Sequence, residues 1–130
     1  MKKKKLFNKI DKVILKNNLE NESFKRITAS FYKYVSIAQP EKFRDSLFLS
    51  FDEMLIFGRI YVAKEGINAQ VSVPQQNWDL FVFRISKIKE LKSIEIKKAL
   101  KEGKSFYKLT IKVRKELVAY GLADDEYDMS

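Results

Sequence analysis

The sequence predicts an α+β fold in which two helices cover one face of a four-stranded antiparallel sheet. In several stretches apolar residues alternate with polar ones, which is the period of a half-buried strand. In two other stretches apolar residues recur every three or four positions, which is the period of a helix. The 130 residues, 45% of them hydrophobic and 13% aromatic, are enough for one core.

The first strand is predicted over residues 27–37, because β-branched and aromatic residues dominate and Ala29, Phe31 and Val35 share one face. A helix is predicted from Pro40, since proline suits the first helical turn. Its buried stripe repeats every four residues: Phe43, Leu47, Phe51 and Leu55.

A β-hairpin is predicted from Phe57 to Val73, with its turn at Lys64-Glu65-Gly66, where glycine can take a positive φ. A second helix is predicted after an Asn77 cap. Its apolar positions are Trp78, Phe81, Ile85 and Ile88.

The last clear strand is predicted over residues 106–113, and the lysine-rich residues 91–100 are interpreted as a short strand or irregular edge. The order strand, helix, strand, strand, helix, strand is that of a ferredoxin-like (acylphosphatase-like) βαββαβ sandwich. In this arrangement the first and third strands are central, and the basic last strand is expected beside the first.

Three segments are predicted along the chain. Residues 1–26 form a basic N-terminal extension, partly helical or disordered, with seven lysines among the first sixteen residues. Its helical stripe would consist of Leu6 or Phe7, Ile10, Val13 and Ile14, and residues 17–22 are interpreted as a loop. Residues 27–122 form the ferredoxin-like domain, and residues 123–130 form an acidic tail that begins a linker.

The chain contains no histidine and no cysteine. Disulfides, thiolate nucleophiles and zinc sites built from these residues are therefore excluded. We predict no catalytic residue, metal or cofactor. No apolar run approaches the length of a membrane span, so a cytoplasmic setting without a membrane partner is expected.

The net charge of +9 is unevenly distributed, with twelve Lys and Arg residues against three Glu between Arg84 and Lys115. A basic half indicates a polyanionic partner such as nucleic acid, although surface lysines are also ordinary. Acylphosphatase activity is not expected, because residues 36–40, which follow the first strand, contain no glycine or arginine to bind an anion.

Because two helices cover only one face of the sheet, the other face must meet water or a partner. The alternation places tyrosines, carboxamides and cations there, which suit base stacking, base-edge contacts and phosphate contacts. Similar side chains are common where protein domains dock, so both partners stay open on composition. The predicted face consists of Tyr32, Tyr34, Arg59, Tyr61, Asn68, Gln70, Ser72, Lys108, Thr110 and Lys112.

Three blocks of sequence resemble one known family. They are SFYKY from Ser30, GRIYVAKEGINAQVSVP from Gly58, and KSF from Lys104 with IKVRKELVAYGL from Ile111. They are similar to the N-terminal domain of the rhodanese-related tRNA uridine hydroxylases. Full-length members of that family are oxidoreductases that form 5-hydroxyuridine at the tRNA wobble position.

In that family a rhodanese domain follows and bears the cysteine thought to carry catalysis. The resemblance therefore implies an accessory domain that helps to bind or position tRNA and is not catalytic alone. The alternative is a module that docks on the rhodanese domain without touching RNA. The candidate contact residues for either role are Tyr32, Lys33, Tyr34, Arg59, Tyr61, Glu65, Asn68, Gln70, Lys108, Lys112, Arg114 and Lys115.

Overall fold

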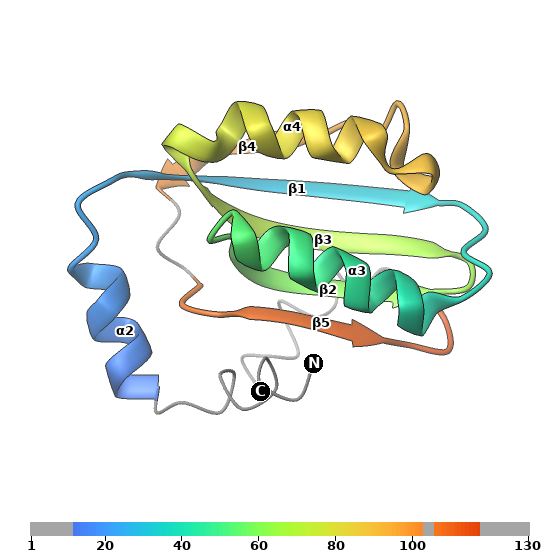
Figure 1. The fold of residues 1–130 in the computed structure, drawn as a ribbon, viewed down its shortest axis with the longest axis horizontal. Coiled ribbons are helices and arrows are strands. Elements are labelled where there is room, and N and C mark those ends of the chain that lie inside the picture. The colour runs from blue at the N-terminus through green and yellow to red at the C-terminus, as the bar shows by residue number, and fades with distance from the viewer. Residues whose placement is uncertain (1–11, 103–105, 118–130) are drawn as a thin grey trace.

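The computed structural model describes residues 12–102 and 106–117. Figure 1 shows one sheet, two helices packed on it, and a separate helix, α2, at one end. The helices are α2 (Lys12–Glu20), α3 (Pro40–Glu53) and α4 (Trp78–Lys87), with short 3-10 turns η1 (Gln75–Asn77) and η2 (Lys89–Leu91). The strands are β1 (Arg26–Tyr34), β2 (Phe57–Ala63), β3 (Gly66–Pro74), β4 (Lys97–Glu102) and β5 (Leu109–Val113).

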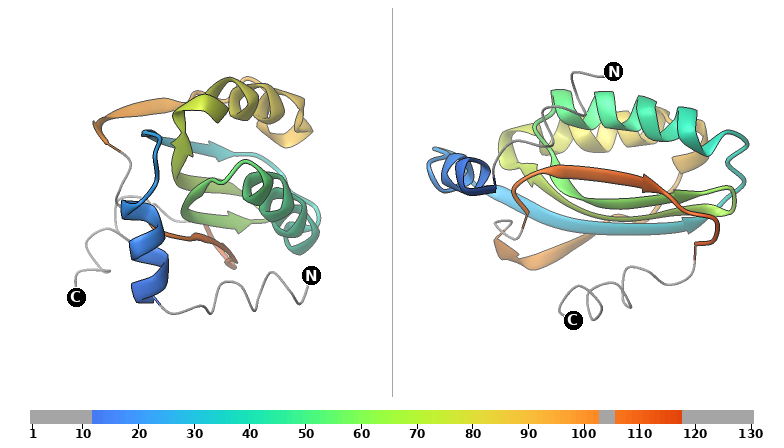
Figure 2. Two further views of the ribbon diagram at one scale, coloured as in Figure 1. Left: turned by 60° about the vertical axis from the view of Figure 1, so that its left-hand side comes forward. Right: turned by 90° about the horizontal axis from the view of Figure 1, so that it is seen from below.

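The ferredoxin-like prediction is confirmed. The strand order is β4-β1-β3-β2-β5, and its first four strands, with α3 and α4, form the βαββαβ unit with β1 and β3 at the centre. Figure 2 (right) shows both helices on the same side of the sheet. None of the described helices is long and apolar enough to cross a membrane.

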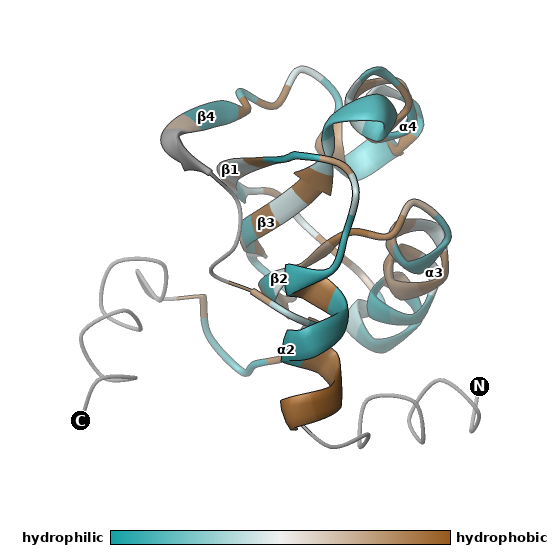
Figure 3. Ribbon diagram, turned by 90° about the vertical axis from the view of Figure 1, so that its left-hand side faces the viewer, coloured by the Kyte–Doolittle hydropathy of each residue, from teal (hydrophilic) through white to brown (hydrophobic). Residues whose placement is uncertain are grey.

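The prediction of the fourth strand was wrong. The strand beside β1 is β4, from the lysine-rich stretch, whereas β5 lies at the opposite edge and runs parallel to β2. The sheet is therefore five-stranded and mixed. The sequence KKALKE of β4 lacks regular apolar alternation because β4 is an edge strand, and Figure 3 colours only part of it hydrophilic.

The core lies between the sheet and the pair α3 and α4. Phe51 and Phe81 are fully buried and meet edge to face, with ring centroids 5.7 Å apart. The predicted α3 stripe holds at Leu47 and Phe51, but the helix ends before Leu55, which is exposed and has a φ of 60°.

Two other local predictions need correction. In α2 the buried residues are Leu15 and Leu19, while Val13 and Ile14 are exposed, and the helix continues to Glu20 through the predicted loop. Leu15 and Leu19 are one helical turn apart, so they form the contact face instead. Residues 1–11 and 118–130, which include part of the predicted N-terminal stripe and the whole acidic tail, lie outside the described residues.

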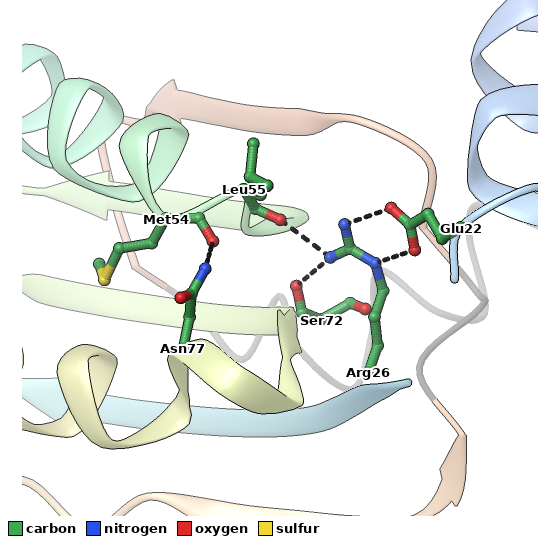
Figure 4. A network of polar contacts seen from close by, with 6 residues as sticks. All are labelled: Glu22, Arg26, Met54, Leu55, Ser72 and Asn77. Atoms are coloured by element: carbon green, nitrogen blue, oxygen red, sulfur yellow. Dashed lines mark hydrogen bonds and ion pairs between the residues drawn. The ribbon is translucent and has the colours of Figure 1, made fainter. Parts of the chain in front are cut away.

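Asn77 precedes α4 as predicted, but its side chain does not cap the helix. Its Nδ2 instead donates a hydrogen bond to the Met54 carbonyl at 2.8 Å, which ties the start of α4 to the end of α3 (Figure 4).

The predicted hairpin turn is confirmed, and its glycine is required. Gly66 has a φ of +154°, and a Cβ there would lie 2.2 Å from the Lys33 carbonyl oxygen and 2.8 Å from Leu117 Cδ2. Gly58 is similar, since a Cβ would lie 2.2 Å from the Gln70 oxygen. Both glycines let β2 and β3 approach their neighbours closely.

Candidate nucleic-acid interface

The sheet has an apolar face and a polar face, as the alternation predicted. Ala69 and Val71 of β3 belong to the core beneath the helices, so Asn68 and Gln70 between them point to the opposite side. Strand register extends this face to neighbouring strands. The polar face consists of Thr28, Ser30, Tyr32, Tyr34, Arg59, Tyr61, Asn68, Gln70, Ser72, Lys97, Thr110 and Lys112.

One row of the polar face crosses all five strands. Lys97 lies opposite Ser30, Ser30 opposite Gln70, Gln70 opposite Arg59, and Arg59 opposite Thr110. The row therefore has a lysine at one edge, polar side chains in the middle and an arginine next to the other edge. Lys97 was not predicted as a contact residue, because the register that places it here depends on the pairing of β4 with β1, which was not predicted.

The adjacent row contains Tyr32, Asn68, Tyr61 and Lys112, in that order across β1, β3, β2 and β5. Tyr61 and Asn68 are each only 6% exposed, whereas Lys112 is exposed. The two side chains in the middle of this row, Asn68 and Tyr61, are thus buried. No described residue provides a hydrogen-bond partner for the buried Asn68 Nδ2.

The cations predicted on the last strand gather at the β2–β5 edge, away from β1. Arg59 and Tyr61 on β2 face Thr110 and Lys112 on β5. The chain then crosses the sheet towards β1, where it reaches Leu117, and the Arg114 guanidinium lies 5.0 Å from the Tyr61 ring centroid. Lys108 and Lys115 lie just before and just after this strand, where Lys115 is exposed and Lys108 half-buried.

At the hairpin end of the polar face, four residues form what we call the Leu117 cluster: Tyr32, Tyr34, Glu65 and Leu117. Both tyrosine hydroxyls donate to the Leu117 carbonyl, at 3.4 Å from Tyr32 and 3.3 Å from Tyr34. The Leu117 amide donates to Glu65 Oε2 at 3.2 Å. Leu117 itself is fully buried, so the segment after β5 is fastened to the polar face.

The two tyrosine rings of this cluster remain accessible at their outer sides. They meet edge to face at 5.3 Å, and Tyr32 is 41% and Tyr34 61% exposed. Burial, followed by the Tyr34 hydrogen bond and the charges of Tyr34 and Glu65, raises the pKa of Tyr32 from 10.0 to about 12. The hydroxyl therefore stays protonated and keeps its role as a donor.

One predicted contact residue lies on the other side of the sheet. Lys33 alternates with Tyr32 and Tyr34, and its Nζ donates to the Lys92 carbonyl at 2.8 Å near η2. Its positive charge is therefore on the helical side, where it cannot act together with the polar face.

A buried arginine that was not predicted fixes the start of the polar face (Figure 4). Arg26 binds both carboxylate oxygens of Glu22 at 2.7 Å and donates to the Leu55 and Ser72 carbonyls at 2.9 Å. Its guanidinium also lies 4.0 Å from the Phe57 ring centroid. The only sequence signal was the Glu–Arg spacing of four residues.

The described residues contain no group of three or more His, Cys, Asp or Glu side chains that could hold a metal ion. What the polar face offers is a set of hydrogen-bonding and cationic groups. Such groups bind polar or anionic partners.

Comparison with protein families identifies the chain. The model of the UPF0176 N-terminal, acylphosphatase-like domain matches residues 26–117. The chain belongs to the UPF0176 acylphosphatase-like domain family. The matched range begins at Arg26, which donates to the Ser72 carbonyl, and ends at Leu117, whose carbonyl accepts from Tyr32. The UPF0176 domain therefore includes both of these contacts.

Two curated relatives of this UPF0176 domain are named tRNA uridine(34) hydroxylase. The protein from Leptospira interrogans serogroup Icterohaemorrhagiae serovar Lai (strain 56601) is 42% identical over 130 residues, covering 99% of this chain and 35% of the relative. The protein from Enterobacter sp. (strain 638) is 43% identical over 127 residues, covering 96% of this chain and 36% of the relative. The chain thus spans about a third of their length.

Two solved structures share the fold of the UPF0176 domain. The BLUF protein BlrB in its dark state aligns with a TM-score of 0.53 at 15% identity, covering 84% of this chain and 88% of that chain. Full-length HypF, in its phosphate- and nucleotide-bound form, aligns with a TM-score of 0.53 at 15% identity, covering 72% of this chain and 12% of that chain. At this identity the likeness shows the fold alone.

Proposed function

We propose that this chain is the tRNA-facing accessory domain of a tRNA uridine(34) hydroxylase and that it binds or positions tRNA through the polar face. The relatives align with nearly the whole chain at 42% and 43% identity, and both are named tRNA uridine(34) hydroxylase. Their names therefore support uridine hydroxylation as the reaction of the whole protein. Hydroxylation itself belongs to the larger part of the protein that this chain does not cover. The resemblance seen in the sequence implies a rhodanese domain there, and the tRNA in the relatives' names supports a cytoplasmic setting.

The row Lys97–Ser30–Gln70–Arg59–Thr110 is the observation that carries this proposal. Lys97 lies on one edge strand and Arg59 lies next to the other edge, with polar side chains between them. An RNA strand that lies across the sheet can therefore place one phosphate near each of these cations. Phosphate contacts supply most of the affinity of proteins for nucleic acids. The basic residues around β5 extend this cationic edge.

The tyrosines contribute to the proposed interface in a more limited way. Because their hydroxyls are engaged by the Leu117 carbonyl, Tyr32 and Tyr34 offer their rings rather than their hydroxyls. An exposed aromatic ring can stack on an unpaired base. A half-buried Gln70 can pair with a base edge through its carboxamide.

The alternative is that the polar face docks on the rest of the hydroxylase and touches no RNA. The exposed tyrosines of the polar face favour it, since aromatic side chains are also enriched at protein contacts. The two functions differ in what the chain does in isolation. Only the first predicts salt-sensitive tRNA binding by this chain alone.

The test is tRNA binding by the isolated 130-residue chain, measured by fluorescence anisotropy at several salt concentrations. Lys97→Glu and Lys112→Glu should each weaken binding and reduce the salt slope by about 0.7–0.9, as expected for one lost phosphate contact. The matched control is Lys87→Glu, the same charge reversal on the helical side, which should leave affinity nearly unchanged. Equal losses in all three variants, or no salt-sensitive binding by the chain, would refute the proposal.

A further inference from the structure

A second surface lies on the opposite side of the molecule, between α3 and α4. It is a groove of about 650 Å³ that begins at the loop after β1 and continues between the two helices to η2. Its apolar lining consists of Ile37, Phe43, Leu47, Phe83 and Ile88. A groove of this kind between helices accepts the apolar side of a partner segment.

The apolar surface at the groove is larger than the core requires. Phe83 lines the groove and is 57% exposed. Leu80, one helical turn earlier in α4 and outside the groove lining, is 42% exposed. Phe81 and Ile85 already supply the buried side of α4, so Leu80 and Phe83, whose ring centroid lies 5.2 Å from Lys87 Nζ, contribute little to the core. Exposed apolar patches rimmed by polar residues commonly mark interaction sites.

The rim of the groove is basic. Lys42, Arg84 and Lys87 line it, with Glu90 as the single acid. Arg84 is bonded to Ser50 and pairs with Glu53, whereas Lys42 and Lys87 form no ion pair with any described residue. Charge complementarity therefore favours a partner segment that carries carboxylates beside its apolar side chains.

We propose that this groove is the docking site for an amphipathic, acid-flanked segment from the part of the hydroxylase outside this chain. The apolar side of the segment packs on Phe83 and the groove floor, and its carboxylates meet Lys42 and Lys87. The inference rests on the proposed function only in that the chain works within a longer protein. The relatives extend over nearly three times the length of this chain, which leaves ample sequence for such a contact.

The experiment compares lysine reactivity in the isolated chain and in a full-length chimera. In the chimera this chain replaces the matched region of the Leptospira hydroxylase. Both proteins are acylated briefly with an amine-reactive reagent, and the modified lysines are quantified by mass spectrometry. If docking is favoured by roughly 1.4 kcal/mol, Lys42 and Lys87 should react about tenfold more slowly in the chimera. Lys64, at the exposed hairpin turn, should react equally in both.

Two variants make the test specific. Phe83→Ser removes an exposed ring and should restore the reactivity of Lys42 in the chimera without unfolding the domain. Val82→Ser, at an exposed α4 position that does not line the groove, should leave the protection intact. Equal reactivity of Lys42 in chimera and isolated chain, or protection that persists in Phe83→Ser, would overturn the inference. Neither outcome affects tRNA binding at Lys97 and Lys112, so the two proposals fail separately.

Discussion

At the scale of single residues, Tyr32 connects the polar face to the segment after β5. Its hydroxyl donates to the Leu117 carbonyl, and its pKa is raised mainly by burial. The neutral form is therefore the one the folded protein favours. Removing the hydroxyl loses a hydrogen bond that contributes about 0.5–1.5 kcal/mol.

The first prediction concerns the titration of this residue. Because the pKa of Tyr32 is higher in the folded protein than its ordinary value of 10.0, its contribution to stability is fully present below pH 10. The contribution is lost as the pH rises through about 12. Ultraviolet titration of tyrosinate should show a step near pH 12 that is absent from Tyr32→Phe. If Tyr32→Phe instead removed signal near pH 10 and left the step near pH 12 in place, the assignment would be contradicted.

The second prediction concerns Gly66. An alanine Cβ would collide with the Lys33 backbone at 2.2 Å and would also impose a strained positive φ. We expect Gly66→Ala to lower the free energy of unfolding in urea by about 1–3 kcal/mol or more. The control is Ser36→Ala in the exposed loop after β1, which should change stability by less than about 0.5 kcal/mol. A neutral Gly66→Ala would mean that β3 does not approach β1 at Lys33 as closely as described.

At the scale of elements, Arg26 joins the start of β1 to three other segments. Its side chain is fully buried, and it binds Glu22, the Leu55 carbonyl and the Ser72 carbonyl.

The third prediction is that Arg26→Met lowers the free energy of unfolding by about 3–5 kcal/mol, because it leaves the Glu22 carboxylate without its partner. Adding Glu22→Gln should recover part of this loss in urea unfolding. Additive effects of the two substitutions would argue against the pair.

The elements show which parts of the fold the sequence could predict. The β2–β3 hairpin and the two core helices have strong periodic patterns, so these elements and their buried faces were predicted correctly, apart from Leu55, which lies beyond the end of α3 and is exposed. β4 was assigned only as a possible edge, because an edge strand with few core contacts has no apolar period. The placement of β5 beside β2 rather than β1 depends on long-range packing, which local patterns do not encode.

The same distinction applies to the polar face. Its membership on β1, β2 and β3 followed from alternation alone, and the observed register confirms it. Lys97 and the Leu117 cluster could not be predicted in this way. The first requires the register of β4 with β1, and the second requires the chain to fold back across the sheet after β5.

At the scale of the whole molecule, the sheet separates two surfaces with different chemistry. The polar face carries cations at its edges and hydrogen-bonding groups on its floor. The helical side carries an apolar groove with a basic rim. This division matches the two proposals made above, tRNA on the polar face and a segment of a longer protein on the helical side.

The most direct measurement is an amide chemical-shift titration of the isotope-labelled chain with a tRNA anticodon stem-loop. The account predicts shifts that decrease with added salt and are largest at Lys97, Ser30, Gln70, Arg59 and Lys112, with the amides of the α3–α4 groove unaffected. No shifts at saturating stem-loop, or shifts confined to α3 and α4, would contradict the claim that the polar face binds tRNA.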